Sequence, residues 1–302
     1  MRGGIVNKGA KSYKHMKKIL FFTLYTASLL IPSVSFAERR VPEDVKIITE
    51  DGWQLNAKWM KPVRENNVFL LIHSQKKDLM EWKTWFPEIE RYGYGYLAVD
   101  LRGHGLSTLT PDGSTTSYRS FSIEGFDNEY NKMIRDIDGA LIWLSSNTVS
   151  ENRVVLVGSR LGANLAIKAA AINSNIPMTV AIYPSLNINS VLTVNPLRAY
   201  GKRPILMLVG YKYERKYTEF QILNGTARSA AGKENVFSIV EADIKNASSL
   251  NKNAIRKVIE WTRNPSLPET VNYDLSLSTA PVSLSTETAD GEEDVPDYEE
   301  ND

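Results

Sequence analysis

Short apolar runs that alternate with longer segments of helical periodicity constrain the fold of this chain more than any other feature. Six such runs follow one another between residues 68 and 242: VFLLIHS, YGYLAVD, RVVLVGS, MTVAIYP, RPILMLVG and NVFSIVEA. Near-continuous apolar runs of this length are typical of strands that are buried on both faces. Their alternation with helical segments predicts an α/β protein with a mostly parallel sheet and helices on both faces.

Residues 44–60, DVKIITEDGWQLNAKWM, precede these runs and alternate between apolar and polar positions. Two alternating strands with a turn at Asp51–Gly52 are the pattern of an antiparallel hairpin. Helical spacing predicts one helix over 78–93 and another over 128–147, with a loop over 101–124 between them. No long insertion separates the later strands, so we expect no separate lid domain.

The first 37 residues differ in composition from the rest of the chain, with six Lys/Arg and no acidic residue. A basic start, the apolar run ILFFTLYTASLLIPSVSFA and small residues at Ser35 and Ala37 predict a secretory signal peptide that is cleaved after Ala37. Residues 1–15 could be an upstream mis-start, because Met16 followed by two lysines is also a plausible beginning. The prediction is therefore an exported protein, periplasmic or secreted in a bacterium.

The apolar run in residues 1–37 is short for a spanning helix and is interrupted by Pro32. We therefore expect no membrane span after cleavage. At the other end, residues 265–302 contain eleven Asp/Glu, no Lys/Arg and many Ser, Thr and Pro residues. Such a composition cannot bury enough apolar surface to offset its ordering entropy, and it predicts a disordered acidic tail. The remaining residues, 38–264, fit a single domain.

Composition also excludes several kinds of site. The chain has no cysteine, which rules out disulfides, thiolate zinc sites and cysteine nucleophiles. Residues 38–264 hold 30 Lys/Arg and 24 Asp/Glu, but no basic cluster with interleaved aromatic residues that would suggest a nucleic-acid partner. Two distant histidines and scattered acids do not have the spacing of metal ligands, so we expect neither a metal nor a cofactor.

Residues 154–166, VVLVGSRLGANLA, place a strand, a tight Gly-Ser-Arg-Leu-Gly turn and a helix in succession. This is the outline of a nucleophile elbow, Gly-x-Ser-x-Gly, in which the central residue is the nucleophile. Between Gly158 and Gly162 the central residue is Arg160, and the serine, Ser159, comes one position early.

Several segments occur in the order and spacing of a known family: LLIHS, LAVDLRGHGLS, VLVGSRLGANLA, YPSLNINSV, YGKRPILMLVG and VIEWTRN. Through them, residues 45–264 resemble the α/β-hydrolase fold, and most closely its single-domain, dienelactone-hydrolase-like esterases. The resemblance implies a serine nucleophile on the elbow, a histidine base, an orienting carboxylate and an oxyanion hole made of backbone N–H groups.

Carried over residue by residue, this resemblance implies a substituted triad. The nucleophile position holds Arg160, the carboxylate position holds Lys212 or Tyr213, and the histidine position falls near Lys245. Beyond residue 37 the only histidines are His73 and His104, which both precede the elbow. We expect both to order loops, with a role as catalytic base as the alternative. The implied oxyanion-hole backbone is that of Leu161 and of Ser74, which replaces the usual glycine.

Two functional hypotheses remain open. If the fold is correct, Arg160, Lys212 and Lys245 gather at the carboxyl edge of the sheet, where this architecture binds ligands. Three cations near a helix N-terminus would suit an anion, such as a carboxylate, a phosphate, a protein partner or the chain's own acidic segment 290–302. Alternatively, these long side chains are simply solvated.

The competing hypothesis is a carboxylic-ester hydrolase in which Ser159 is an atypical nucleophile. The expected role of Ser159 is instead that of a hydrogen-bonded turn serine, because one position before the elbow centre the side chain points away from the pocket. A third class, a structural or assembly factor, would be indicated by a stable protein partner and no small-molecule ligand.

Overall fold

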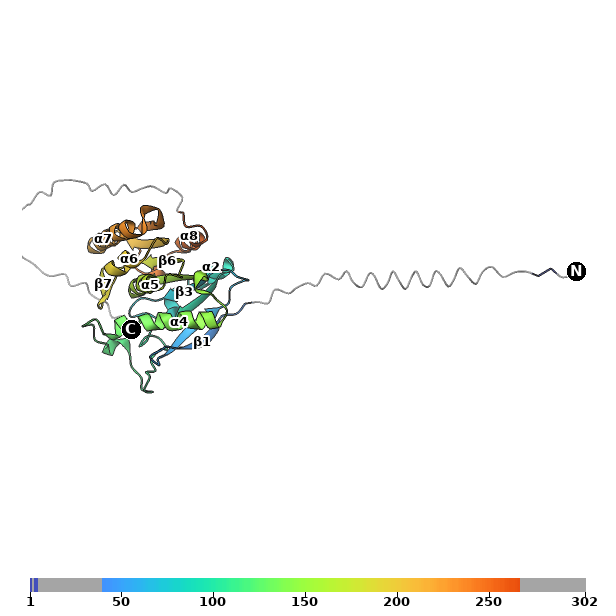
Figure 1. Cartoon of the computed structure of the whole chain (residues 1–302), viewed down its shortest axis with the longest axis horizontal. Coiled ribbons are helices and arrows are strands. Elements are labelled where there is room, and N and C mark those ends of the chain that lie inside the picture. The colour runs from blue at the N-terminus through green and yellow to red at the C-terminus, as the bar shows by residue number, and fades with distance from the viewer. Residues whose placement is uncertain (2, 5–39, 267–302) are drawn as a thin grey trace, which may run out of the picture.

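The computed structural model describes residues 1, 3–4 and 40–266. An eight-stranded sheet has the order β1-β2-β4-β3-β5-β6-β9-β10 (Figure 1). Its strands are β1 (Glu43–Ile48), β2 (Gln54–Met60), β3 (Val68–Ile72), β4 (Gly95–Val99), β5 (Val154–Ser159), β6 (Met178–Ile182), β9 (Ile205–Gly210) and β10 (Val236–Glu241). From β4 to β10 all neighbouring strands are parallel. The predicted α/β class with a mostly parallel sheet is confirmed.

The expected N-terminal hairpin is also present. Strands β1 and β2 pair in antiparallel register from Glu43 opposite Trp59 to Ile48 opposite Gln54, and β2 continues antiparallel to β4. The turn includes Gly52 at a φ of 86°, a conformation that glycine adopts without a steric penalty.

Helices cover both faces of the sheet, as the sequence predicted. They are α2 (Phe86–Arg91), α3 (Glu129–Lys132), α4 (Ile134–Ser146), α5 (Leu161–Ile172), α6 (Val194–Ala199), α7 (Glu214–Ala231) and α8 (Lys252–Arg263). Helices α4, α5, α6 and α7 contact one another in a row, whereas α2 contacts α8. Every residue of β3, β4, β5 and β9 is buried, as expected when both faces of a sheet are covered.

Three segments differ from the sequence expectation. The helix predicted over 78–93 is divided into a 3-10 turn, η1 (Leu79–Trp82), and α2, because α2 begins afresh at a first turn that contains Pro87. The helix predicted over 128–147 is divided at Met133 into α3 and α4. The connection from β6 to β9 contains a small hairpin, β7 (Asn187–Ile188) and β8 (Val191–Leu192), followed by α6.

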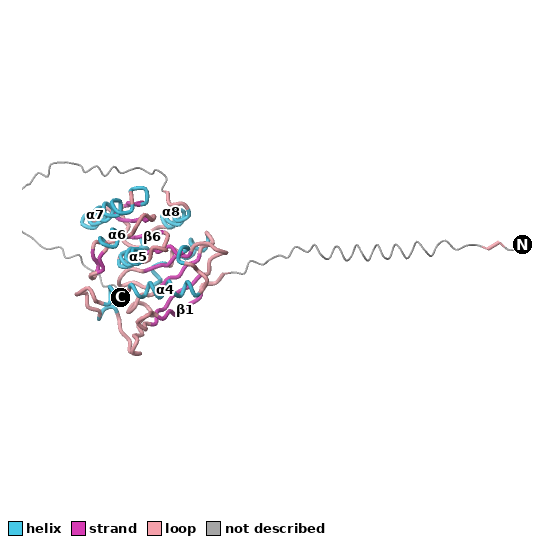
Figure 2. The backbone as a smooth tube through the Cα atoms, in the orientation of Figure 1, coloured by secondary structure: helices cyan, strands magenta, loops and turns pink. Residues whose placement is uncertain are grey.

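The remaining regular elements are short 3-10 turns: η2 (Tyr118–Ser120), η3 (Glu151–Arg153), η4 (Lys233–Asn235) and η5 (Ala247–Ser249). The long connection between β4 and α3 contains only η2, and loop conformation dominates it (Figure 2). Within the described residues no helix is both long and apolar enough to cross a membrane. The predicted signal peptide apart from residues 1 and 3–4, and the predicted tail beyond residue 266, lie outside the described residues.

Candidate functional site

The elbow turn is formed as the motif predicts, with arginine at its centre. Strand β5 ends at Ser159, Arg160 has φ 51° and ψ −110°, and α5 begins at Leu161. This backbone conformation is sparsely populated by residues that have a Cβ atom. A Cβ on Gly158 would lie 2.1 Å from the carbonyl oxygen of Gly162, and one on Gly162 would lie 2.1 Å from that of Ile72. Close packing of strand, turn and helix therefore requires both glycines.

Arg160 holds its strained conformation while its side chain is exposed. Its backbone N–H donates to the carbonyl oxygen of Ile182, the last residue of β6, at 2.8 Å. Its guanidinium carbon lies 5.7 Å from the centre of the Tyr183 ring, a cation–π distance. The turn is thus anchored to the neighbouring strand through its backbone, and its charged group lies over an aromatic ring.

A row of cations and aromatic rings continues from this point. The rings of Tyr183 and Tyr213 meet edge to face, with centres 6.5 Å apart, and the ammonium nitrogen of Lys245 lies 5.1 Å from the centre of the Tyr213 ring. Burial, as the largest influence, raises the pKa of Tyr183, so this phenol is neutral at ordinary pH. We call these four residues, Arg160, Tyr183, Tyr213 and Lys245, the cation–tyrosine row.

Lys212 does not belong to the cation–tyrosine row. Its ammonium nitrogen lies 2.7 Å from a carboxylate oxygen of Asp243, and the two side chains are 55% and 66% exposed. In contrast, no carboxylate of the described residues forms an ion pair with Arg160 or Lys245. Two of the three cations expected at this edge are therefore connected through two tyrosine rings, and the third forms an ion pair with Asp243.

Ser159 is completely buried beneath the turn. Its Oγ accepts a hydrogen bond from the backbone N–H of Ala247 at 2.9 Å and lies 2.9 Å from Oε1 of Glu81 and 2.8 Å from the hydroxyl of Ser74. Its hydroxyl group faces this cluster of polar groups rather than the exposed side of Arg160. The structure thus places Ser159 as a buried, hydrogen-bonded turn residue.

The backbone of Ser74, expected to be part of an oxyanion hole, is engaged elsewhere. Its N–H donates to Oε2 of Glu81 at 2.6 Å, and its hydroxyl donates to Oε1 of the same carboxyl at 2.8 Å. A carboxyl group of the chain itself therefore already occupies the N–H that the resemblance assigns to the oxyanion hole. Leu161 is the first residue of α5, so its N–H is one of the N-terminal groups without a partner within the helix.

His73 and His104 are both buried and order loops. The Nδ1 of His73 donates to the carbonyl oxygen of Ser74 at 2.7 Å, and its Nε2 accepts from the N–H of Leu101 at 3.0 Å. His104 stacks on Tyr118 with ring centres 4.3 Å apart, and its Nδ1 donates to the carbonyl oxygen of Arg102. Burial lowers the pKa of His73 to about 4 and that of His104 to about 3, so both rings are neutral near pH 7.

Arg102 is a residue whose role the sequence did not reveal. It is fully buried, and its guanidinium lies 2.7 Å from carboxylate oxygens of both Asp136 and Asp51 and 3.2 Å from Glu129. Its backbone N–H also donates to Asp136 at 2.8 Å. These carboxylates come from α4, the β1–β2 turn and α3. Arg102 thus ties three separate segments together, which no local pattern around residue 102 could indicate.

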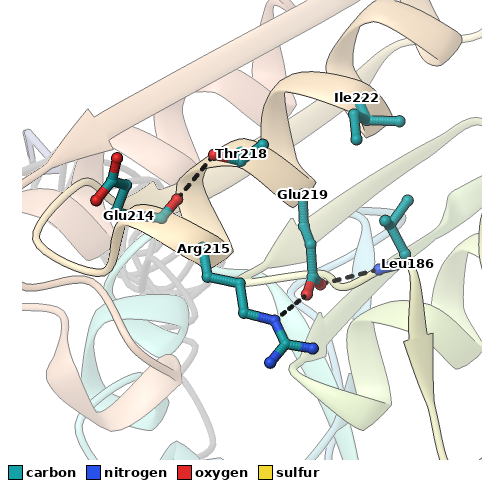
Figure 3. Close-up of a pocket in the computed structure, with 6 residues that line it drawn as sticks. All are labelled: Leu186, Glu214, Arg215, Thr218, Glu219 and Ile222. Atoms are coloured by element: carbon teal, nitrogen blue, oxygen red, sulfur yellow. Dashed lines mark hydrogen bonds and ion pairs between the residues drawn. The ribbon is translucent and has the colours of Figure 1, made fainter. Parts of the chain in front are cut away.

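An open groove of about 520 Å³ lies along α7 (Figure 3). Its lining comes from α7 and from the segment after β6: Leu186, Glu214, Arg215, Thr218, Glu219 and Ile222. Figure 3 shows Glu219 bridging from α7 to the N–H of Leu186 and to Arg215. No residue of the cation–tyrosine row lines this groove, so it is not the elbow site. Among the residues with described placement, no group of three or more His, Asp or Glu side chains could hold a metal ion.

Comparison with known proteins identifies a family whose model matches this chain. A family model described as acetyl xylan esterase (AXE1) matches residues 44–202. A polyketide transferase from a Penicillium species is 28% identical over 171 residues, which are 55% of this chain and 50% of that protein. The chain therefore spans about half the length of the curated relative that it matches.

Solved structures share the fold. An esterase from Pyrococcus furiosus has a TM-score of 0.59 at 20% identity, covering 74% of this chain and 91% of that one. A dienelactone hydrolase from Anabaena variabilis has a TM-score of 0.56 at 13% identity, covering 74% of this chain and 95% of that one. At these identities the likeness establishes the α/β-hydrolase fold and nothing finer.

Proposed function

This chain belongs to the acetyl xylan esterase family, and on that premise we propose that it keeps the α/β-hydrolase fold but binds an anionic group instead of hydrolysing an ester. The observation that carries the proposal is the position of Arg160. This arginine is exposed at the centre of the elbow turn, with φ 51° and ψ −110°, where the motif expects the nucleophile.

Arginine cannot act as the nucleophile. Its guanidinium stays protonated and offers only hydrogen-bond donors. The adjacent serine, Ser159, is fully buried, and its hydroxyl oxygen is surrounded by the Ala247 N–H, Ser74 and Glu81. An ester carbonyl at the mouth of the turn would therefore meet a cation in place of an oxygen nucleophile.

A base for serine chemistry is also absent from its usual place. The loop over 242–251, which precedes α8, contains no histidine. His73 has both ring nitrogens in hydrogen bonds, and Nδ1 of His104 is bonded to a backbone carbonyl while its Nε2 is buried. Neither ring is placed to take a proton from a group at the exposed Arg160.

The charges of the cation–tyrosine row support binding of an anion. Arg160 and Lys245 have no carboxylate partner among the described residues, so a ligand would not have to displace an internal ion pair. The N-terminus of α5 begins at the next residue after Arg160 and adds partial positive charge. A planar guanidinium also suits two oxygens of a carboxylate or phosphate.

The family match specifically favours the alternative, a carboxylic-ester hydrolase. Fluorophosphonate labelling of the purified chain, followed by intact mass and peptide mapping, separates the two hypotheses. We expect no adduct under conditions in which an active serine esterase is labelled fully. A stoichiometric adduct on Ser159, or on any other serine, would overturn the proposal and establish an activated nucleophile.

Anion binding is tested directly by calorimetric titration with inorganic pyrophosphate at low and high salt. We expect an affinity that falls with salt and at least about tenfold weaker binding in Arg160→Ala, equivalent to ~1.4 kcal/mol. Lys245→Ala should weaken binding less. Lys212→Ala is the matched control, since it removes another exposed lysine, one that is paired with Asp243, and it should leave the affinity unchanged.

Two results would contradict this binding site. One is the absence of pyrophosphate binding at any salt concentration, and the other is an Arg160→Ala protein that binds as well as the parent chain. A synthetic peptide with the sequence of residues 290–302, added to the same titration, tests whether an acidic peptide competes with pyrophosphate. Competition would favour an acidic protein segment, including the chain's own, as the natural occupant.

We also propose that residues 1–37 direct export and are removed after Ala37. The support is their basic start, apolar run and small residues before the predicted cleavage point. Mass spectrometry of the protein from a bacterial periplasmic fraction should give a chain that starts at Glu38. A chain that retains residues 1–37 and stays in the cytoplasm would contradict export.

A further inference from the structure

One buried hydrogen bond connects the two segments that carry the cations of the proposed site. The N–H of Ala247 donates to Oγ of Ser159 at 2.9 Å. Ser159 is covalently next to Arg160, and Ala247 comes two residues after Lys245. Both partners of this bond are completely buried. The bond therefore joins the elbow turn directly to the loop over 242–251, which precedes α8.

We propose that Ser159 is a positioning residue, whose hydroxyl fixes the Lys245 loop against the elbow turn and so sets the spacing between Arg160 and Lys245. This inference rests on the proposed anion site. It assigns a task to the serine that resembles a displaced nucleophile, and this task is one of geometry rather than chemistry.

The hydroxyl of Ser159 is itself held firmly. Glu81, which is 7% exposed, receives the N–H and hydroxyl of Ser74 and lies 2.9 Å from the Ser159 oxygen. When Ser159 donates its single proton to Glu81, its lone pairs remain available for the Ala247 N–H. The carboxyl group thus orients the serine as an acceptor toward the loop.

Ala247 is held from its other side as well. Its carbonyl oxygen accepts from the indole N–H of the fully buried Trp85 at 3.1 Å. Between Ala247 and Lys245 the loop is short and internally bonded, because Asn246 caps η5 and the Lys245 N–H donates to Ser249 Oγ at 3.0 Å. A displacement of Ala247 would therefore be transmitted to the Lys245 side chain.

Ser74 provides a matched control for Ser159. Its hydroxyl belongs to the same buried cluster and is bonded to the same carboxyl, but it makes no bond to Ala247. Ser74→Ala and Ser159→Ala each remove one buried oxygen of the same size. Only Ser159→Ala removes the acceptor of the Ala247 N–H, so a difference between the variants reports on that bond alone.

The absence of cysteine from the chain allows a clean spin-label experiment. Ser248→Cys introduces a label at an exposed position of η5, and Lys233→Cys introduces a reference label in η4. We expect the electron paramagnetic resonance spectrum of the Ser248 label to show greater mobility in Ser159→Ala than in Ser74→Ala. The Lys233 label should give the same spectrum in both. Equal mobility of the Ser248 label in the two variants would overturn the proposal.

Ala247→Pro tests the same bond from the donor side and serves if Ser159→Ala does not fold. Ala247 is the first residue of η5, a position at which proline is favoured. The N–H of this residue has no partner within η5, so proline would remove only its hydrogen bond to Ser159. The variant removes the donor while Ser159 remains intact. We expect it to raise the mobility of the Ser248 label as Ser159→Ala does, and an unchanged spectrum would contradict the proposal.

The affinity for pyrophosphate shows whether the Ser159–Ala247 hydrogen bond affects the proposed anion site. Pyrophosphate binding should weaken several-fold in Ser159→Ala, and this effect should vanish when Lys245→Ala is already present. A merely structural role would give the same loss in both backgrounds and would overturn the positioning role. If the parent chain does not bind pyrophosphate at all, the proposed function fails, whereas the spin-label comparison still decides whether Ser159 holds the loop.

Discussion

Arg102 and Arg160 both follow strands of the same sheet, yet their surroundings are opposite. Arg102 is fully buried and contacts three carboxylates, from Asp51, Asp136 and Glu129. Arg160 is exposed, has no ion pair among the described residues, and lies over one tyrosine ring. The guanidinium N–H groups of Arg102 are used within the fold, whereas those of Arg160 are available to a ligand. Residue type alone therefore says little about the role of a cation.

Among the substitutions that test this comparison, Arg102→Ala should change the free energy of unfolding most. Arg102→Ala leaves Asp136 buried without its partner, and breaking a buried pair in this way costs about 3–5 kcal/mol. Urea unfolding should show this loss. Arg160→Ala is the control at the same sheet edge and should change the free energy of unfolding by less than about 0.5 kcal/mol. Equal losses in both variants would remove the distinction between the two arginines.

Acidification should also affect the Arg102 region and leave the charge of Arg160 unchanged. His104 donates to the carbonyl oxygen of Arg102, and burial lowers the pKa of His73 to about 4 from an unfolded value near 6.5. The unfolded chain therefore binds more protons between these values, so the stability that His73 contributes is complete above pH 6.5 and is lost as the pH falls toward 4.

For His73 alone, the shift corresponds to a loss of about 2 kcal/mol between pH 6.5 and pH 5. Burial of His104 acts in the same direction. The measurement is the urea midpoint at pH 7 and pH 5, repeated with Arg160→Ala, which should show the same pH dependence. A free energy of unfolding that is flat over this interval would mean that the histidines are not buried in their neutral form.

A third comparison concerns the two buried serines, Ser159 and Ser74, whose hydroxyls are both bonded to Glu81. Ser159→Ala should lower the free energy of unfolding by about 1–3 kcal/mol, because it leaves the Ala247 N–H buried without an acceptor. Ser74→Ala should cost less, since no backbone group depends on that hydroxyl for its only partner. Thermal and urea unfolding of the two variants give the difference, and a larger loss in Ser74→Ala would contradict the hydrogen-bond assignment.

Arg160→Gly should change the free energy of unfolding least, and should raise it where the preceding variants lower it. Glycine adopts the φ of 51° and ψ of −110° without a Cβ clash, so we expect a gain of about 1 kcal/mol in the free energy of unfolding. Pyrophosphate binding should be lost in the same variant. A gain in stability together with a loss of affinity would show that the strained arginine is retained for a ligand. A destabilised Arg160→Gly chain would mean that arginine contributes to the fold.

Much of the fold could be predicted from the sequence, because apolar periodicity and turn residues act locally. The six strands, the hairpin at Asp51–Gly52 and the elbow glycines all follow from patterns within a few residues. The split of the helix predicted over 78–93 was missed although Pro87 marks it. The β7–β8 hairpin was also missed, because its strands are only two residues long and leave no periodic signal.

The candidate site likewise has some features that the sequence predicts and others that only the tertiary structure sets. That arginine stands between Gly158 and Gly162, and that no histidine follows the last strand, can be read from the sequence alone, since both depend only on residue order. Only the tertiary structure decided that Lys212 pairs with Asp243, that Glu81 folds back onto Ser74 and Ser159, and that three carboxylates surround Arg102. Each of these contacts joins separate segments of the chain, and the partner of a side chain is set by how the layers pack rather than by its neighbours in sequence.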